Sequence, residues 1–175
     1  MISFRDFLRF AEKLYLEAQS NCATRASYPY IIGSILSSWM SIEAFLNSMM
    51  QDFTFLPKGK LSVHEIGFLE EKQVRFATEG KKMGTFQIEK GPDYRHIDEK
   101  IMFLIAKFGD TKFVDKGGKF WQKFERVKDL RNALAHPRRN REIDLTLKDA
   151  EDAMDVARSV IELVAKEVWR KPVKW

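Results

Sequence analysis

The residues best suited to chemistry lie in one short segment, Arg131-Asn132-Ala133-Leu134-Ala135-His136, which closes a helical run and is cut off by Pro137. His136 is one of only three histidines in the chain, and an unperturbed imidazole can accept or donate a proton near neutral pH. Arg131 stays charged and can hold two phosphate oxygens at once. A proton carrier beside a fixed guanidinium is what cleavage of a phosphodiester requires.

The spacing around this segment predicts how its side chains are arranged. Glu125, Asp129, Asn132 and His136 follow one another at intervals of four, three and four, which predicts a continuous polar line along one helix. Proline disfavours helical geometry in the residue before it, so we expect His136 at the helix end. The same pattern also fits a structural role, in which the arginine pairs with a carboxylate and the histidine caps the last carbonyls.

Composition predicts the kind of domain that positions these residues. A chain of 175 residues is most simply one domain, and its few glycines and prolines (9 and 5) favour helices over sheet. The single cysteine, Cys22, excludes an internal disulfide framework and is typical of a cytoplasmic protein. A net charge of +5 favours an anionic partner such as RNA.

Neither a membrane segment nor a metal site is expected. Charged residues interrupt the first turns, so no signal peptide is predicted. The longest uncharged run, residues 26 to 42, contains a proline, a glycine and serines that favour a buried bundle helix over a membrane span. His64, His96 and Cys22 show no metal-ligand spacing, and no P-loop or dinucleotide fingerprint is present. We therefore expect no cofactor and no metal.

Hydrophobic periodicity and capping signals predict a bundle made only of helices. Serines along the helix that begins near Pro29 are expected to let a neighbouring helix come close. Ser62-x-x-Glu65 and Thr146-x-x-Asp149 read as helix starts. Residues 79 to 92 are expected to form a basic loop with room for a short extended piece. The predicted helices cover residues 3 to 19, 29 to 53, 62 to 78, 93 to 108, 119 to 136 and 146 to 169.

Three segments, in order, resemble the HEPN superfamily of small helical bundles. They are Trp39-Met40-Ser41-Ile42-Glu43-Ala44-Phe45-Leu46-Asn47, Leu130 to Pro137 with its Arg-Asn-x-x-x-His pattern, and the helix start Leu145-Thr146-Leu147-Lys148-Asp149-Ala150. The resemblance covers about residues 26 to 55 and 119 to 170. It implies an up-and-down bundle in a single domain, residues 1 to 175, with extra helices inserted at about 58 to 117.

The resemblance also implies an activity. Family members of this type are metal-independent endoribonucleases, often toxins or defence effectors, that work as homodimers with two motifs facing a shared cleft. The 2′-hydroxyl of RNA attacks the adjacent phosphorus, while His136 moves protons and Arg131 stabilises the developing charge. Asn132 would orient the imidazole or hold the phosphate. The alternative is a non-catalytic HEPN module that binds RNA, a nucleotide or a partner protein such as an antitoxin.

Two further sets of residues are candidates around the motif. Glu43 stands amid apolar neighbours on the long helix, so we expect it near the site as a partner of Arg131, or else paired with another basic residue of the bundle. Three arginines after Pro137 fit contacts with the RNA backbone, or a solvated turn. They are Arg138, Arg139 and Arg141.

Overall fold

The computed structural model describes residues 3–21, 25–57, 59–136, 143–173 and 175. It divides into two compact units, one formed by Met1–Phe45 with Ile105–Trp175 and the other by Leu46–Leu104. In chain order, the elements are α1 (Phe4–Ser20), a 3-10 turn (Arg25–Ser27), α2 (Tyr28–Thr54), α3 (Val63–Leu69), β1 (Lys72–Phe76), a 3-10 turn (Gly80–Lys82), β2 (Phe86–Pro92), α4 (Ile97–Phe108), α5 (Lys119–Ala135), α6 (Leu147–Val164) and a π-helical turn (Ala165–Trp169).

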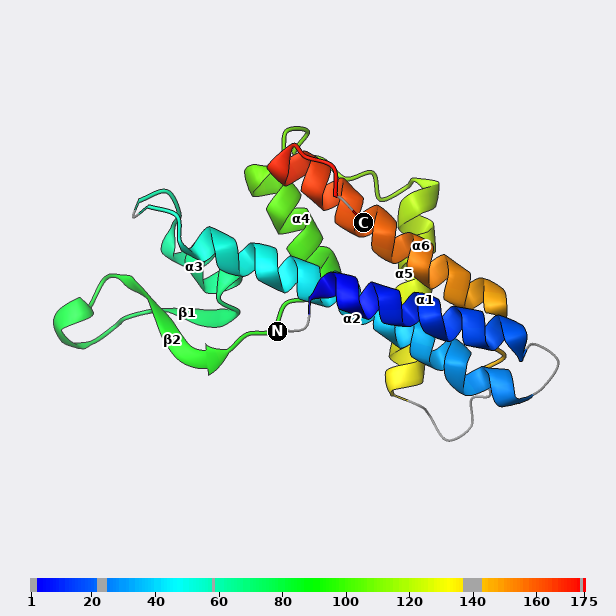
Figure 1. The fold of residues 1–175 in the computed structure, drawn as a ribbon. Helices are drawn as coiled ribbons and strands as arrows, with labels where there is room; N and C mark the ends of the chain where they lie inside the picture. Colours follow the sequence, from blue (N-terminus) through cyan, green and yellow to red (C-terminus); the bar gives the residue numbers. More distant parts are fainter. Residues whose placement is uncertain (1–2, 22–24, 58, 137–142, 174) are drawn as a thin grey trace. The chain divides into compact units, whose positions relative to one another are not determined.

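The first unit is helical in its described part. It contains α1, the first two thirds of α2, α5 and α6, and α6 packs against both α1 and α5 (Figure 1). The predicted helix start at Thr146 is confirmed, because its side chain accepts a hydrogen bond from the Asp149 N–H while Asp149 binds back to the Thr146 backbone. These reciprocal bonds satisfy N–H groups that the first turn of a helix would otherwise leave unpaired.

Buried serines let α1 approach α2 closely, as the sequence predicted. Ser34 donates a hydrogen bond from its hydroxyl to the Ala11 carbonyl of α1, at 2.9 Å. Ser38 and Ser41 are also buried, and their hydroxyls donate to carbonyls of α2 itself, at 2.8 and 2.7 Å. Each hydroxyl therefore has a partner, so these polar groups can be buried without a large desolvation penalty.

Aromatic rings join α2 to α5 in the core of this unit. Trp39 of α2 stacks on Phe124 of α5, with ring centroids 5.6 Å apart, and Trp121 lies 4.9 Å from Phe124. All three side chains are buried, and Phe124 has no exposed surface. Rings of this size contribute much of the apolar area that a core removes from water. The packing fixes α5, the helix that carries the candidate motif.

The protein is mostly helical, as predicted, but the second unit contains a β-hairpin, so the described chain is not made only of helices. Strands β1 and β2 pair in antiparallel fashion, with Val74 opposite Ile88 and Phe76 opposite Phe86. The unit also holds the end of α2, the short helix α3 and the start of α4. It overlaps the segment 58 to 117 that was predicted to be an insertion, but that segment does not consist of extra helices alone.

Two helix boundaries in this unit also differ from prediction. The helix that begins at the Ser62 capping box ends at Leu69 rather than near residue 78, because the backbone turns at Glu71 (φ 51°) and enters β1. α4 begins at Ile97 rather than at Asp93, and the side chain of Glu99 accepts the His96 N–H at its start. The positions predicted as helix in residues 72 to 76 are strand.

No helix in the part of the chain that the structure describes combines the length and the apolar character needed to cross a membrane.

Candidate functional site

The candidate motif occupies the last turn of α5. Arg131 lies seven residues after the buried Phe124, which places both side chains on nearly the same side of the helix. That side faces α2, as the stacking of Phe124 on Trp39 shows. The side chain of Arg131 is therefore half-buried, with 28% of its surface exposed, and it reaches residues of α2.

Arg131 forms an ion pair with Glu43, for which the sequence had left open either Arg131 or another basic residue as the partner. Nη2 of Arg131 lies 2.9 Å from Oε1 of Glu43. The same oxygen accepts the indole N–H of Trp39 at 2.8 Å, and the guanidinium carbon lies 5.9 Å from the centre of the Trp39 ring. Trp39 and Glu43 are one helical turn apart on α2, so one carboxylate oxygen joins the core to the arginine.

Asn132 completes this cluster on the solvent side. Its Oδ1 accepts a hydrogen bond from Nη1 of Arg131 at 3.2 Å, and its side chain is exposed. Two N–H groups of the guanidinium are thus used in bonds to described residues, of the five that an arginine carries. Arg131, Asn132 and Glu43 therefore form one cluster of side chains, in which both Asn132 and Glu43 accept hydrogen bonds from the arginine.

His136 ends the helix, as Pro137 predicted. Its backbone is no longer helical (φ −130°, ψ 67°), although its N–H still donates to the Asn132 carbonyl at 3.0 Å. The side chain is exposed, and its imidazole makes no hydrogen bond with any residue that the structure describes. Neither Arg131 nor Asn132 is therefore in a hydrogen bond with the imidazole, which is open to solvent.

The three arginines expected to contact an RNA backbone, Arg138, Arg139 and Arg141, lie outside the described residues.

A cavity of about 440 Å³ opens on a different side of α5 from Arg131. The Arg126 guanidinium at its wall binds Asp149 at 2.5 Å and Asp152 at 3.5 Å, so its charge is already paired. The motif residues do not line this cavity. Its walls are formed by Arg126, Asp129, Leu130, Ala133, Ile143, Asp144 and Asp149.

A charged network supports α5 against α6 on this side. Burial raises the pKa of the Asp152 carboxyl, but hydrogen bonds from Lys123 and Lys148 outweigh that effect and hold its pKa below its ordinary value. Lys123 Nζ lies 2.9 Å from Asp152 and 3.1 Å from Asp155. Burial lowers the pKa of Lys123, but hydrogen bonds to these two carboxylates raise it above its ordinary value overall. Asp152 is therefore a structural anion that joins the two helices.

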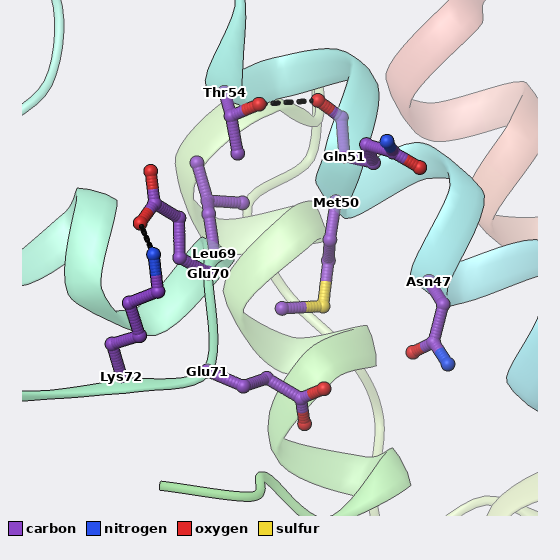
Figure 2. A pocket seen from close by; sticks show the side chains of 8 residues that line it. All are labelled: Asn47, Met50, Gln51, Thr54, Leu69, Glu70, Glu71 and Lys72. Carbon is purple, nitrogen blue, oxygen red and sulfur yellow. Dashed lines mark hydrogen bonds and ion pairs between the residues drawn. The ribbon is translucent and has the colours of Figure 1, made fainter. Parts of the chain in front are cut away.

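A second hollow, of about 360 Å³, lies within the Leu46–Leu104 unit (Figure 2). Two of its lining residues bind the buried Lys100, whose Nζ lies 2.9 Å from Oε1 of Glu71 and donates to Oδ1 of Asn47 at 2.7 Å. At its rim, Lys72 pairs with Glu70 at 2.7 Å. Both lysines are neutralised by neighbours, so this hollow offers no spare charge to a ligand. It is lined by Asn47, Met50, Gln51, Thr54, Leu69, Glu70, Glu71 and Lys72.

No group of three or more His, Cys, Asp or Glu side chains placed to hold a metal ion occurs among residues 3–21, 25–57, 59–136, 143–173 and 175.

Trp39 was not predicted as a site residue, yet its indole N–H helps to hold the carboxylate of the candidate site. The signal that could have revealed this is the spacing of four between Trp39 and Glu43, which puts both side chains on one face of a helix. Trp39 is 3% exposed, so its N–H needs a partner inside the protein. Glu43 provides it.

Comparisons with known proteins identified no relative of this chain. No protein-family model, curated protein or solved structure shows a significant match to this chain.

Proposed function

We propose that the protein is a metal-independent endoribonuclease of the HEPN type, with His136 as the proton carrier and Arg131 as the group that stabilises charge. The observation that carries the proposal is the arrangement at the end of α5. There a guanidinium held by Glu43 and Asn132 lies within two helical turns of a solvent-exposed imidazole. The Arg-Asn-x-x-x-His pattern that resembles the family is thus built around an arginine with a defined position.

The proposed reaction uses the nucleophile that RNA itself carries. The 2′-hydroxyl loses its proton to an imidazole and attacks the adjacent phosphorus. The bond from phosphorus to the 5′ oxygen then breaks, and that oxygen takes up a proton. The products are a cyclic 2′,3′-phosphate and a free 5′-hydroxyl. Positioned acid–base catalysis of this kind contributes roughly 10²- to 10⁴-fold to a rate.

Arg131 is suited to stabilise the extra negative charge on phosphorus in the transition state. Its guanidinium is planar and always charged, and the N–H groups not bonded to Glu43 and Asn132 can donate to phosphate oxygens. A donor whose position is fixed before the reaction needs no reorganisation when charge develops. The ion pair with Glu43 weakens the positive electrostatic field of Arg131, but it fixes the orientation of the guanidinium.

In this proposal two copies of the chain face each other, so that one imidazole acts as the base and the other as the acid. The exposure of His136 in the single chain is compatible with a site completed by a second copy. A toxin or defence effector of this kind would be restrained by an antitoxin protein.

A specific observation favours a second candidate function, a non-catalytic module that binds RNA, a nucleotide or a protein. Arg131 already has Glu43, Asn132 and the face of Trp39 as partners, so its guanidinium is satisfied without any ligand. An arginine whose role is structural would have the same contacts. This module would bind through the exposed end of α5 without cleaving its ligand.

The decisive experiment is cleavage of RNA by the purified protein in the presence of a chelator. We expect the wild type to leave cyclic phosphate ends, and His136→Ala to lose at least ~100-fold of the activity. His96→Ala is the matched control, because His96 is also exposed but lies outside the motif. Equal decay of RNA with wild type and His136→Ala would mean a contaminating nuclease and would remove the proposal. Binding without turnover would favour the second candidate.

A further inference from the structure

The β-hairpin of the second unit is covered by α3 over only part of its length. Val74 is paired with Ile88 and Phe76 with Phe86, so all four side chains lie on one face of the hairpin. Gly67 of α3 lies against this face, since a Cβ there would be 2.3 Å from Cγ2 of Val74. The missing side chain lets α3 cover Val74 closely. Figure 1 shows the far end of the hairpin projecting beyond α3.

The same face continues as an aromatic cluster formed by Phe76 and Phe86 of the hairpin, with His64 of α3 at its edge. The rings of Phe76 and Phe86 meet at 5.2 Å between centroids, and His64 lies 4.6 Å from Phe86. Phe76 is 46% exposed and Phe86 is 49% exposed, while Met83 in the turn is 68% exposed. Grouped apolar side chains on the surface mark sites of interaction.

Basic side chains accompany this aromatic cluster. The hairpin, Lys72–Pro92, contains five basic and two acidic residues. Arg75 and Glu89 offset each other at 3.6 Å. Lys81 and Lys82 in the turn are exposed, and neither forms an ion pair within the described part of the chain. The turn between Phe76 and Phe86 therefore carries a net charge of +1, because Glu79 offsets one of the two lysines.

We infer that this end of the hairpin binds single-stranded RNA, with the rings of Phe76 and Phe86 stacking on bases and Lys81 and Lys82 contacting phosphates. An unpaired strand presents exposed base faces and a regular negative charge, which are the two features that this surface complements. A purely apolar partner would use the rings but would gain nothing from two unpaired lysines. The choice of RNA rests on the proposed function; the surface itself is independent of the motif on α5.

The two halves of the surface predict different effects on binding. Base stacking on an aromatic side chain is sequence-tolerant, and losing it weakens affinity by about 5- to 100-fold for each base. Each phosphate contact contributes roughly 0.7 to the slope of log K against log salt concentration for a single strand. Loss of Lys81 and Lys82 should therefore lower that slope by up to about 1.4.

The test measures fluorescence anisotropy of a short, unstructured, labelled RNA over a series of salt concentrations. Every protein carries His136→Ala, so that the RNA stays intact. Phe76→Leu/Phe86→Leu keeps apolar packing but removes the flat rings, and Lys81→Gln/Lys82→Gln removes the charge. The matched controls, Phe10→Ala and Lys13→Gln/Lys166→Gln, change exposed residues of the first unit. Circular dichroism melts verify that each variant is folded.

We expect the leucine variant to bind at least about 5-fold more weakly with an unchanged salt slope, and the glutamine variant to show a smaller slope. Wild-type-like binding by both variants would overturn the inference, even if self-association or capture of a protein were lost instead. The inference would also be overturned if the glutamine variant had a smaller salt slope but the leucine variant bound like the wild type. Binding would then be a nonspecific electrostatic attraction between the lysines and the RNA.

Different results would refute the proposed nuclease activity and the proposed RNA-binding surface of the hairpin. Cleavage by the wild type together with normal RNA binding by the hairpin variants removes only the hairpin surface. Binding that depends on the hairpin, in a wild-type protein that never cleaves RNA, removes the nuclease and leaves the hairpin surface standing.

Discussion

Removing the Glu43 carboxylate should destabilise the first unit in a measurable and specific way. One oxygen of Glu43 accepts the indole N–H of Trp39 at 2.8 Å and a guanidinium N–H of Arg131 at 2.9 Å. Glu43→Ala leaves both donors without this acceptor. Glu43→Gln keeps an acceptor oxygen but removes the negative charge, so it separates the hydrogen bonds from the ion pair.

The expected cost follows from the burial of the two donors. Trp39 is 3% exposed, and a buried donor left without a partner costs about 1–3 kcal/mol. Arg131 and Glu43 are 28% and 35% exposed, so solvent screens their pairing and its contribution is about 1 kcal/mol. Glu43→Ala should therefore lower the free energy of unfolding by roughly 2–4 kcal/mol, and Glu43→Gln by about 1 kcal/mol.

The assay is urea unfolding followed by both tryptophan fluorescence and circular dichroism, because coincident transitions establish two-state behaviour. A double-mutant cycle of Glu43→Ala with Arg131→Ala should give a coupling energy of about 1 kcal/mol. Glu151→Ala is the control. Its ion pair with Lys148, at 2.8 Å, is largely exposed and should contribute less than about 0.5 kcal/mol.

Two results would refute this reasoning. One is a loss of stability in Glu43→Ala no larger than that of Glu151→Ala, which would mean that solvent replaces both hydrogen bonds at little cost. The other is strict additivity in the cycle, which would mean that Arg131 is not held by Glu43 in solution.

Two other perturbations test the packing of the second unit and the charged network of the first. Gly67→Ala places a Cβ 2.3 Å from Val74 Cγ2, so we expect a loss of about 1–3 kcal/mol, detected as faster limited proteolysis of the hairpin. Lys123 and Lys148 hold the pKa of Asp152 below its ordinary value. Its stabilisation should therefore be present above about pH 4 and be lost at lower pH as the carboxyl is protonated. In urea titrations at several pH values, Asp152→Asn should reduce the loss of stability below about pH 4. The same loss in Asp152→Asn as in the wild type would contradict this role of Asp152.

The helices were predictable from sequence wherever local signals agreed. Thr146-x-x-Asp149 starts α6 as expected, because a capping box needs only residues three apart. Ser34 on α2 meets the α1 backbone as its small size suggested. These features depend on short stretches of chain, where propensity and capping decide the outcome.

The first strand of the hairpin was missed because its signal is short and follows a strong helix start, whereas the second strand lies in residues 79 to 92, where a short extended piece was expected. The box at Ser62 does start a helix, but only a seven-residue one. In residues 72 to 76, apolar Val74 and Phe76 alternate with polar residues, which is the period of a strand. Five residues are too few to separate this period from a continuing helix. What decides is tertiary contact, since Val74 packs against Gly67.

The sequence identified the types of residue in the candidate site, but it could not identify which of them contact one another. Arg131 and His136 are visible as a motif within six residues, whereas Glu43 lies 88 positions before its partner. Sequence alone left Glu43 with any basic residue of the bundle as a possible partner. Only the packing of α2 on α5 selects Arg131, through Trp39 and Phe124.

The two principal groups of the motif are held in different ways, which bears on any catalytic role. Arg131 is fixed through Glu43 and Trp39 to the buried ring of Phe124, so its position follows from the core. His136 lies one residue beyond the helix, where a backbone hydrogen bond holds its main chain while its imidazole remains exposed. Catalytic geometry tolerates errors of only about 0.5 Å, so an imidazole in this position must be oriented by the RNA or by a second copy of the chain. The nuclease proposal therefore requires a completed assembly.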